Sequence, residues 1–402
     1  MSTWGAGLFN TTRNPAQLNT RSFAGTILRL FPNGSAPMFA LTSQSGKSKA
    51  KASTHGYFSK VMKFITLAVP ASGFTNVATD WNGFASTAGM VKSMVLHNLR
   101  TRENVLVSAV DNGTDLTVVR GFGRVAAAAM NAGDKLICVG TANPEGSVRP
   151  AARNLNTTYI PNFTQIFRNA WALTDTARAS LAEQGWSNVA ENRKDCSMFH
   201  AVDIEAAIIW GQPLMDTTGE QPMHTTQGVL DALEQYAPGN TNPAGSTTSY
   251  SQFVDMVEPA FQYATDASNP KERIAFGDNT AIKVLNKMGR LAGDITITQN
   301  ETSFGMSFQQ IKFYKGTINL VEHPLMNGLG TQGNLLVMDM AALKLAYLDG
   351  RDTKAEEYGM GGKQVENGID AVGGSLTTEC AVELINPYSC AYIEGLTDAV
   401  AG

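Results

Sequence analysis

Residues 188–211 of this 402-residue chain read NVAENRKDCSMFHAVDIEAAIIWG, and this stretch predicts one long, uninterrupted helix. Asn188 and Glu191 stand three residues apart, which resembles the capping box found at helix N-termini. Neither glycine nor proline occurs in residues 189–210, and Gly211 and Pro213 then end the pattern. About 22 residues at 1.5 Å per residue give a helix of roughly 33 Å.

The residues before this helix are rich in β-forming side chains. Residues 57–69 predict a strand whose lysines guard an exposed edge against wrong pairing, and residues 157–171 could return antiparallel to it. Between them, two β-prone runs flank Asp111-Asn112-Gly113, which is a strong hairpin signal. We therefore expect a long hairpin that carries a small β-rich insertion, residues 82–148, at its tip.

The rest of the chain mixes helical and strand patterns, which indicates an α+β protein. An extended arm is expected at residues 1–20 and a short helix at 22–31. After the long helix, the expected elements are helices at 226–236, about 250–265 and 278–291, long strands within 294–324, an apolar run at 334–348, a glycine-rich loop at 359–374 and a final strand pair at 376–394.

The composition is that of a globular protein with few charges. Hydrophobic residues make up 43% of the chain and charged residues only 16%. A subunit that is covered mostly by copies of itself needs few surface charges, so this mildly favours a self-assembling protein over an ordinary enzyme. No secretory signal and no run of roughly 18–20 apolar residues is found, and the four cysteines are widely spaced. We therefore expect buried free thiols and a cytoplasmic origin.

The charges are unevenly distributed along the chain. The first 79 residues contain no Asp or Glu, and their eight basic residues are Arg13, Arg21, Arg29, Lys47, Lys49, Lys51, Lys60 and Lys63. Since the whole chain carries −4, removing this +8 leaves −12 on the remaining residues. Opposite charges on two parts suit head-to-tail docking of copies, so these eight residues are our candidates for inter-subunit contacts. An arm that binds nucleic acid and an ordinary solvated face remain as alternatives.

No catalytic or metal-binding motif is complete. The GKS at residues 46–48 resembles the end of a phosphate-binding loop, but Leu41 occupies the position of the required glycine. Asp203 and Glu205 stand two apart and so do not share a helix face, which makes them a poor acid/base pair. His200 on the same helix is expected to be a packing or surface residue, and the histidines show no metal-ligand spacing. We therefore expect no catalytic residue, no cofactor and no metal.

Several phrases of the chain resemble one known family. They are VVRGFG at 118–123, GDKL at 133–136, NPEGS at 143–147 with an extra proline, NFTQIF at 162–167 and DIEAAIIWG at 203–211. Together with the order of arm, long hairpin, long helix, mixed domain, glycine loop and final strand, they resemble the Hong Kong 97-type major capsid protein of tailed bacteriophages. The resemblance is to the branch with a β-rich insertion in the extended loop, and it covers most of the chain.

The resemblance implies an α+β capsid fold in four parts. Residues 1–50 would form the N-terminal arm, and residues 51–172 the extended loop with its β-rich insertion at 82–148. The peripheral domain with its spine helix would take 173–211, 291–324 and 376–402, and the axial domain, at the five- and six-fold axes, mainly 212–290 and 325–375.

The same resemblance implies a structural protein and not an enzyme. Pentamers and hexamers of the chain would assemble into an icosahedral head shell around double-stranded DNA, which would touch the inner face without sequence specificity. Further expected partners are a portal protein, with scaffold or decoration proteins as candidates, and no membrane. The protein would be made and assembled in the host bacterial cytoplasm and end in the virion. Two alternatives remain: an encapsulin-type compartment of the same fold, and an unrecognised cytoplasmic enzyme.

Overall fold

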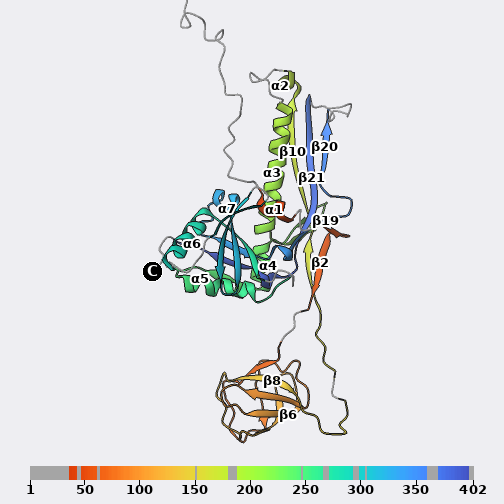
Figure 1. Cartoon of the computed structure of the whole chain (residues 1–402). Coiled ribbons are helices and arrows are strands. Elements are labelled where there is room, and N and C mark those ends of the chain that lie inside the picture. Colours follow the sequence, from red (N-terminus) through yellow and green to blue (C-terminus); the bar gives the residue numbers. More distant parts are fainter. Residues whose placement is uncertain are drawn as a thin grey trace, which may run out of the picture. The chain divides into compact units, whose positions relative to one another are not determined.

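The computed structural model describes residues 36–42, 47–60, 64–149, 152–179, 188–245, 248–265, 271–292, 298–303, 306–359 and 370–397. The chain divides into two compact units (Figure 1). We call Phe58–Tyr159 the β unit, and the part formed by the residues up to Tyr57 and from Ile160 onward the body. Helices and strands both contribute, so the predicted α+β class is confirmed.

The predicted long helix is confirmed as α3, Asn188–Trp210, with 23 residues. It lies beside β10 in the body (Figure 1). The sheet here has the order β1 (Ser48–Ala50), β19 (Leu343–Leu348), β21 (Ala371–Leu384) and β10 (Gln165–Thr174), with β20 (Lys354–Tyr358) also paired to β21. Near the C-terminal end of α3, Ile204, Ile208 and Ile209 are buried in the body's core, which anchors the helix there.

A seven-stranded sheet forms the other part of the body. Its order is β13 (Thr241–Pro243), β22 (Ala391–Glu394), β18 (Leu335–Met338), β14 (Glu272–Gly277), β17 (Gly316–Glu322), β16 (Met306–Phe313) and β15 (Thr298–Ser303). Neighbouring residues of β14 belong to two different hydrophobic clusters: Phe276 packs with α3 and α4 residues, and Ala275 with α5 and α6 residues. Because side chains alternate along a strand, this sheet is buried on both faces.

The predicted helices after α3 are confirmed, with one shortened. They are α4 (Val229–Tyr236), α5 (Tyr250–Val257) and α6 (Asn279–Ala292). The helix expected to reach residue 265 ends at Val257 and continues only as a 3-10 turn, Glu258–Phe261. Pro259 explains the difference, because proline lacks an amide hydrogen and its ring collides with the preceding turn of an α-helix.

The strand pairing joins segments that the predicted domains kept apart. Residues 291–324 were expected beside the long helix, but β17 pairs in parallel with β14, which comes from the predicted 212–290 part. Conversely, β19 and β20 were assigned to the other part, 325–375, but pair with β21 next to β10. Sequence order could not show this, because these pairings join segments far apart in the chain.

The last strands also differ from expectation. β21 begins at Ala371, so the end of the expected glycine loop 359–374 is strand. Glycine is needed there because a Cβ on Gly374 would lie 2.8 Å from Trp171 Nε1 of the neighbouring β10. Furthermore, β21 and β22 belong to different sheets and do not form the expected pair.

The β unit contains one six-stranded sheet. Its order is β3 (Thr66–Ala68), β8 (Lys135–Thr141), β5 (Met94–Asn98), β6 (Asn104–Val110), β7 (Leu116–Val119) and β4 (Asp80–Trp81). The predicted hairpin is confirmed, since β6 and β7 pair antiparallel on either side of residues 111–115. The unit is wider than the expected 82–148, because Phe74 and the fully buried Trp81 stack 4.9 Å apart in its core.

The chain enters and leaves the β unit through a two-stranded ribbon of β2 (Thr54–Ser59) and β9 (Thr158–Phe163). The strand expected at 57–69 is thus two strands, β2 and β3. The remaining elements are α1 (Pro37–Thr42), α2 (Asp175–Ala179), β11 (Leu214–Asp216), β12 (Met223–Thr225) and α7 (Pro324–Gly328), with short 3-10 turns at Pro238–Asn240, Met340–Ala342 and Pro387–Ser389. The arm at 1–20 and the helix at 22–31 lie outside the described residues. In the described part, no helix is both long and apolar enough to cross a membrane.

Candidate assembly surfaces

The structure describes half of the eight candidate contact residues. Arg13, Arg21, Arg29 and Lys63 lie outside the described residues. Lys51 and Lys60 are exposed and form no ion pair with any described residue.

Lys47 and Lys49 have partners in their own chain. Lys47 Nζ lies 2.5 Å from Asp352 Oδ2 and 4.8 Å from the centre of the Tyr347 ring. Lys49 Nζ lies 3.8 Å from Asp349 Oδ1. Both pairs follow from the parallel pairing of β1 with β19. Burial alone would raise the pKa of Asp352, but the hydrogen bond from Lys47 lowers it overall.

The segment before β1 is held by a buried carboxylate. Glu205 on α3 is fully buried, and its oxygens accept hydrogen bonds from the backbone amides of Met38 (2.8 Å) and Phe39 (2.6 Å) at the start of α1. His323 Nε2 lies 2.8 Å from the same carboxylate. Asp203, two residues earlier, is exposed and bonds to Asn169 instead, so the two acids do face apart as expected. Glu205 therefore holds the start of α1 on α3.

His200 is a packing residue, as expected. Its ring nitrogens lie 2.7 Å from Asn169 Oδ1 of β10 and 2.7 Å from Thr378 Oγ1 of β21. Burial lowers its pKa. The side chain thus ties α3 to both long strands.

The phrase at residues 118–123 builds the centre of the β unit. Arg120 donates from Nε and Nη2 to the buried Glu103 carboxylate at 2.8 and 2.9 Å. That carboxylate also accepts the backbone amides of Gly121 (2.9 Å) and Ala128 (3.1 Å). Burial alone would raise the pKa of Glu103, but these hydrogen bonds outweigh it and lower the pKa. Arg120 also lies over the Trp81 ring, 5.4 Å from its centre.

The phrase at residues 133–136 has a similar structural role. Asp134 accepts hydrogen bonds from Arg100 Nε and Nη2 at 2.8 Å each, and from the backbone amide of Asn131 at 3.0 Å. Hydrogen bonding by Arg100 lowers the pKa of Asp134 to about 2. These two family phrases are therefore ion-pair centres that hold loops of the β unit on its sheet.

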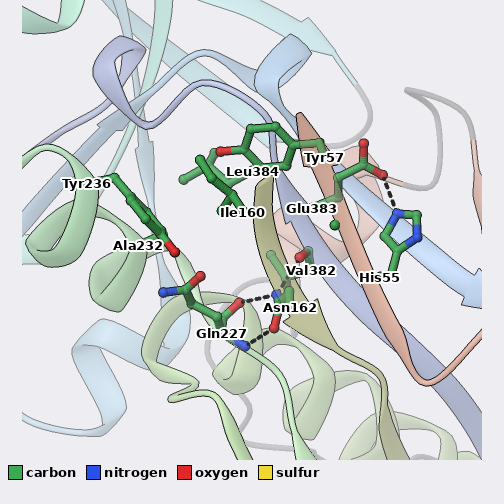
Figure 2. Close-up of a pocket in the computed structure, with 11 residues that line it drawn as sticks. His55, Tyr57, Ile160, Asn162, Gln227, Ala232, Tyr236, Val382, Glu383 and Leu384 are labelled. Atoms are coloured by element: carbon green, nitrogen blue, oxygen red, sulfur yellow. Dashed lines mark hydrogen bonds and ion pairs between the residues drawn. The ribbon is translucent and has the colours of Figure 1, made fainter. Parts of the chain in front are cut away.

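The root of the ribbon is tied to the body around a small pocket (Figure 2). Asn162 of β9 donates from Nδ2 to the carbonyls of Val382 (2.6 Å) and Gln227 (3.1 Å), and its Oδ1 accepts the Gln227 amide at 2.7 Å. His55 of β2 lies 3.1 Å from the Glu383 carboxylate. Asn162 opens the family phrase at 162–167, so this phrase fixes the ribbon where it meets the body.

Large apolar side chains are exposed along the ribbon and just beyond it. Phe58 is 72% exposed, Tyr159 is 44% exposed, and their rings lie 5.1 Å apart. Phe64 is 84% exposed. Phe58 and Tyr159 thus form an exposed aromatic pair, which makes the ribbon a candidate contact surface.

Sequence reasoning did not single out Glu205 as an anchor or the ribbon aromatics as a surface. The feature of the sequence that could have indicated Glu205 is its place among the apolar residues of the last turns of the long helix. For the ribbon, the signal was two phenylalanines, Phe58 and Phe64, on either side of Lys60 and Lys63.

The SU10 major capsid protein family matches residues 9–397 of the chain. The chain belongs to this family. A major capsid protein of Pseudomonas phage PaMx41 is 49% identical, over 98% of this chain and 96% of the relative. The family is structural, so the chain is a phage shell subunit and virion component, not an enzyme. The expected identity as a phage major capsid protein is thereby confirmed.

Solved structures with a similar course of the chain include phage particles and an encapsulin. The structure from Mycobacterium phage Cain has a TM-score of 0.48 and 9% identity, and the alignment covers 98% of this chain and 100% of that chain. Microbacterium phage Oxtober96 gives 0.47 at 11%, with 96% and 98% covered. The SrpI encapsulin of Synechococcus elongatus gives 0.43 at 10%, with 61% and 79% covered.

Proposed function

We propose that copies of this chain form the icosahedral head shell of a tailed phage around double-stranded DNA, with assembly in the host cytoplasm. Membership in the SU10 major capsid protein family over residues 9–397 carries this proposal. A portal protein, and scaffold or decoration proteins, are the further partners that such a shell would use.

The strand pairing supports a revised assignment of capsid domains. The sheet of β1, β19, β21, β10 and β20 with α3 would be the peripheral domain and its spine helix. The seven-stranded sheet with α4, α5 and α6 would be the axial domain. The ribbon and the β unit would be the extended loop and its insertion.

The charges of the two units support docking between copies. The β unit has ten Lys and Arg against six Asp and Glu, a net +4, which leaves −8 on the rest of the −4 chain. Opposite fields steer association and fix its register. The exposed aromatics of the ribbon would gain burial against another copy.

Among the candidate contact residues, we propose different roles for two groups. Lys47 and Lys49 pair with acids of their own chain, whereas Lys51 and Lys60 are exposed, pair with no described residue and would meet a neighbour. The residues outside the described part, Arg13, Arg21, Arg29 and Lys63, stay candidates for contacts between subunits.

Electron cryomicroscopy of particles purified from an infected or expressing host tests the proposed function. We expect closed icosahedral shells, and nuclease-protected double-stranded DNA in particles from infection. Shells that hold a protein cargo and no DNA would favour the encapsulin-type alternative. A discrete small oligomer without shells under all assembly conditions would contradict the proposal.

A further inference from the structure

The body carries an exposed hairpin that is apolar and acidic, and the β unit carries a groove that is apolar and basic. The hairpin is formed by β11 and β12, and every residue from 212 to 223 is exposed except the half-buried Asp216. Its base is fixed, because the Gly228 amide donates to the Gly211 carbonyl at 2.8 Å. A Cβ on Gly211 would lie 2.5 Å from two carbonyl oxygens, so only glycine fits this crossing. The hairpin is therefore a projection on a rigid base.

One face of this hairpin is apolar and acidic. Leu214 and Asp216 are two residues apart on β11 and so point to the same face of the hairpin. Met223 of β12 pairs with Asp216, so its side chain lies on this face too. Leu214 is 57% exposed and Met223 is 64% exposed. The other face carries His224, whose ring stacks against Phe163 of β9 at 6.1 Å. Glu220 lies in the turn, and residues 212–228 contain no Lys or Arg.

The groove of about 760 Å³ in the β unit is lined by residues of β6 and of the loop that follows β8. Leu106, Phe122 and Val148 supply its apolar lining, with Phe122 39% and Val148 90% exposed. Its charged lining residues are Lys92 and Arg149, which form no ion pair with any described residue, and none of its lining residues is acidic. An apolar groove with basic residues suits an apolar ligand that carries carboxylates.

We propose that the hairpin of one copy docks in this groove on the β unit of a neighbouring copy. Leu214 and Met223 would enter the apolar part, and the carboxylates of Asp216 and Glu220 would meet the basic residues. A second copy is the occupant that the charges favour, since a −8 part supplies the hairpin and a +4 unit supplies the groove. Because the two surfaces differ, the contact is head-to-tail and repeats around a ring or lattice. The inference rests on the shell-forming function proposed above.

Reciprocal charge reversal tests the contact in the full chain. One variant combines Lys92→Glu with Arg149→Glu, a second combines Asp216→Lys with Glu220→Lys, and a third carries all four changes. We expect each pair alone to lower the yield of closed shells about tenfold or more, and the fourfold variant to recover most of it. Arg102→Glu with Lys135→Glu is the matched control, because it makes the same charge change on the β unit outside the groove, and it should lower the yield much less than the groove pair does.

A photo-crosslinking residue at position 223 provides a second test that needs no charge change. In shells mixed from isotopically light and heavy copies, we expect mixed-label products between position 223 and peptides 106–122 or 142–149. The same probe at Leu329, another exposed site, should not label these peptides. Products on other peptides only, or pair variants that assemble as well as wild type, would overturn the inference. Wild-type protein that forms no shell would instead count against the proposed function itself.

Discussion

Removal of the Glu103 carboxylate should open the β unit without unfolding the body. In Glu103→Ala, the guanidinium of Arg120 stays in place with a side chain only 5% exposed, but its ionic partner is lost. The amides of Gly121 and Ala128 also lose their acceptor. Breaking one side of a buried ion pair costs about 3–5 kcal/mol, a large part of the 5–15 kcal/mol stability of an ordinary domain.

Hydrogen exchange of the full chain, followed by mass spectrometry, measures this loss locally. A single midpoint of unfolding would be a poor measure, because a chain with two compact units need not unfold in one step. A loss of 3–5 kcal/mol corresponds to exchange about 100- to 4,000-fold faster in β5, β6 and β7, since each 1.4 kcal/mol is about tenfold. Peptides of α3 and β21 should exchange as in wild type.

Two further variants separate the ion pair from simple loss of packing. Asp80→Asn, at an exposed acid of the same unit, should change stability by less than about 0.5 kcal/mol. Glu103→Leu with Arg120→Met removes both charges and should recover part of the loss, because the hydrophobic replacement leaves no unpaired charge, although the amides of Gly121 and Ala128 still lack an acceptor. If Glu103→Ala exchanged as slowly as Asp80→Asn, the reasoning that this pair holds the unit together would be refuted.

Three other outcomes follow from the described contacts. Glu205→Ala should release α1 and speed exchange of the Met38 and Phe39 amides by about tenfold or more, and unchanged exchange would argue against the anchor. The pair with Arg100 lowers the pKa of Asp134 to about 2. The stability that this pair contributes is therefore present above the usual pKa of an aspartate, near 4, and is lost as the pH falls from about 4 to 2. Near-ultraviolet circular dichroism should show a step in this pH window, and Asp134→Asn should lack that step. Gly374→Ala should cost about 1–3 kcal/mol in denaturant unfolding, because its Cβ would lie 2.6 Å from a backbone oxygen, whereas Gly239→Ala, with open space around it, should cost less than about 1 kcal/mol.

Local patterns predicted the elements of this fold but not all their partners. The helix at 188–210 followed from an uninterrupted helical pattern, and the β6–β7 hairpin from its turn residues, because both depend on neighbours in the chain. The parallel pairing of β14 with β17, and the separation of β21 from β22, depend on contacts between distant segments. Such contacts leave little local trace, so sequence patterns could not show which of these strands pair.

The sequence alone determined the α+β class, the family and the uneven distribution of charge, since each can be counted or matched along the chain. Only the tertiary structure decided which groups each charged side chain contacts. It pairs Lys47 and Lys49 with acids of their own chain, and it buries Glu205 and Glu103 against backbone amides. A charge acts through the groups within a few ångströms of it, and folding, not order along the chain, sets those groups.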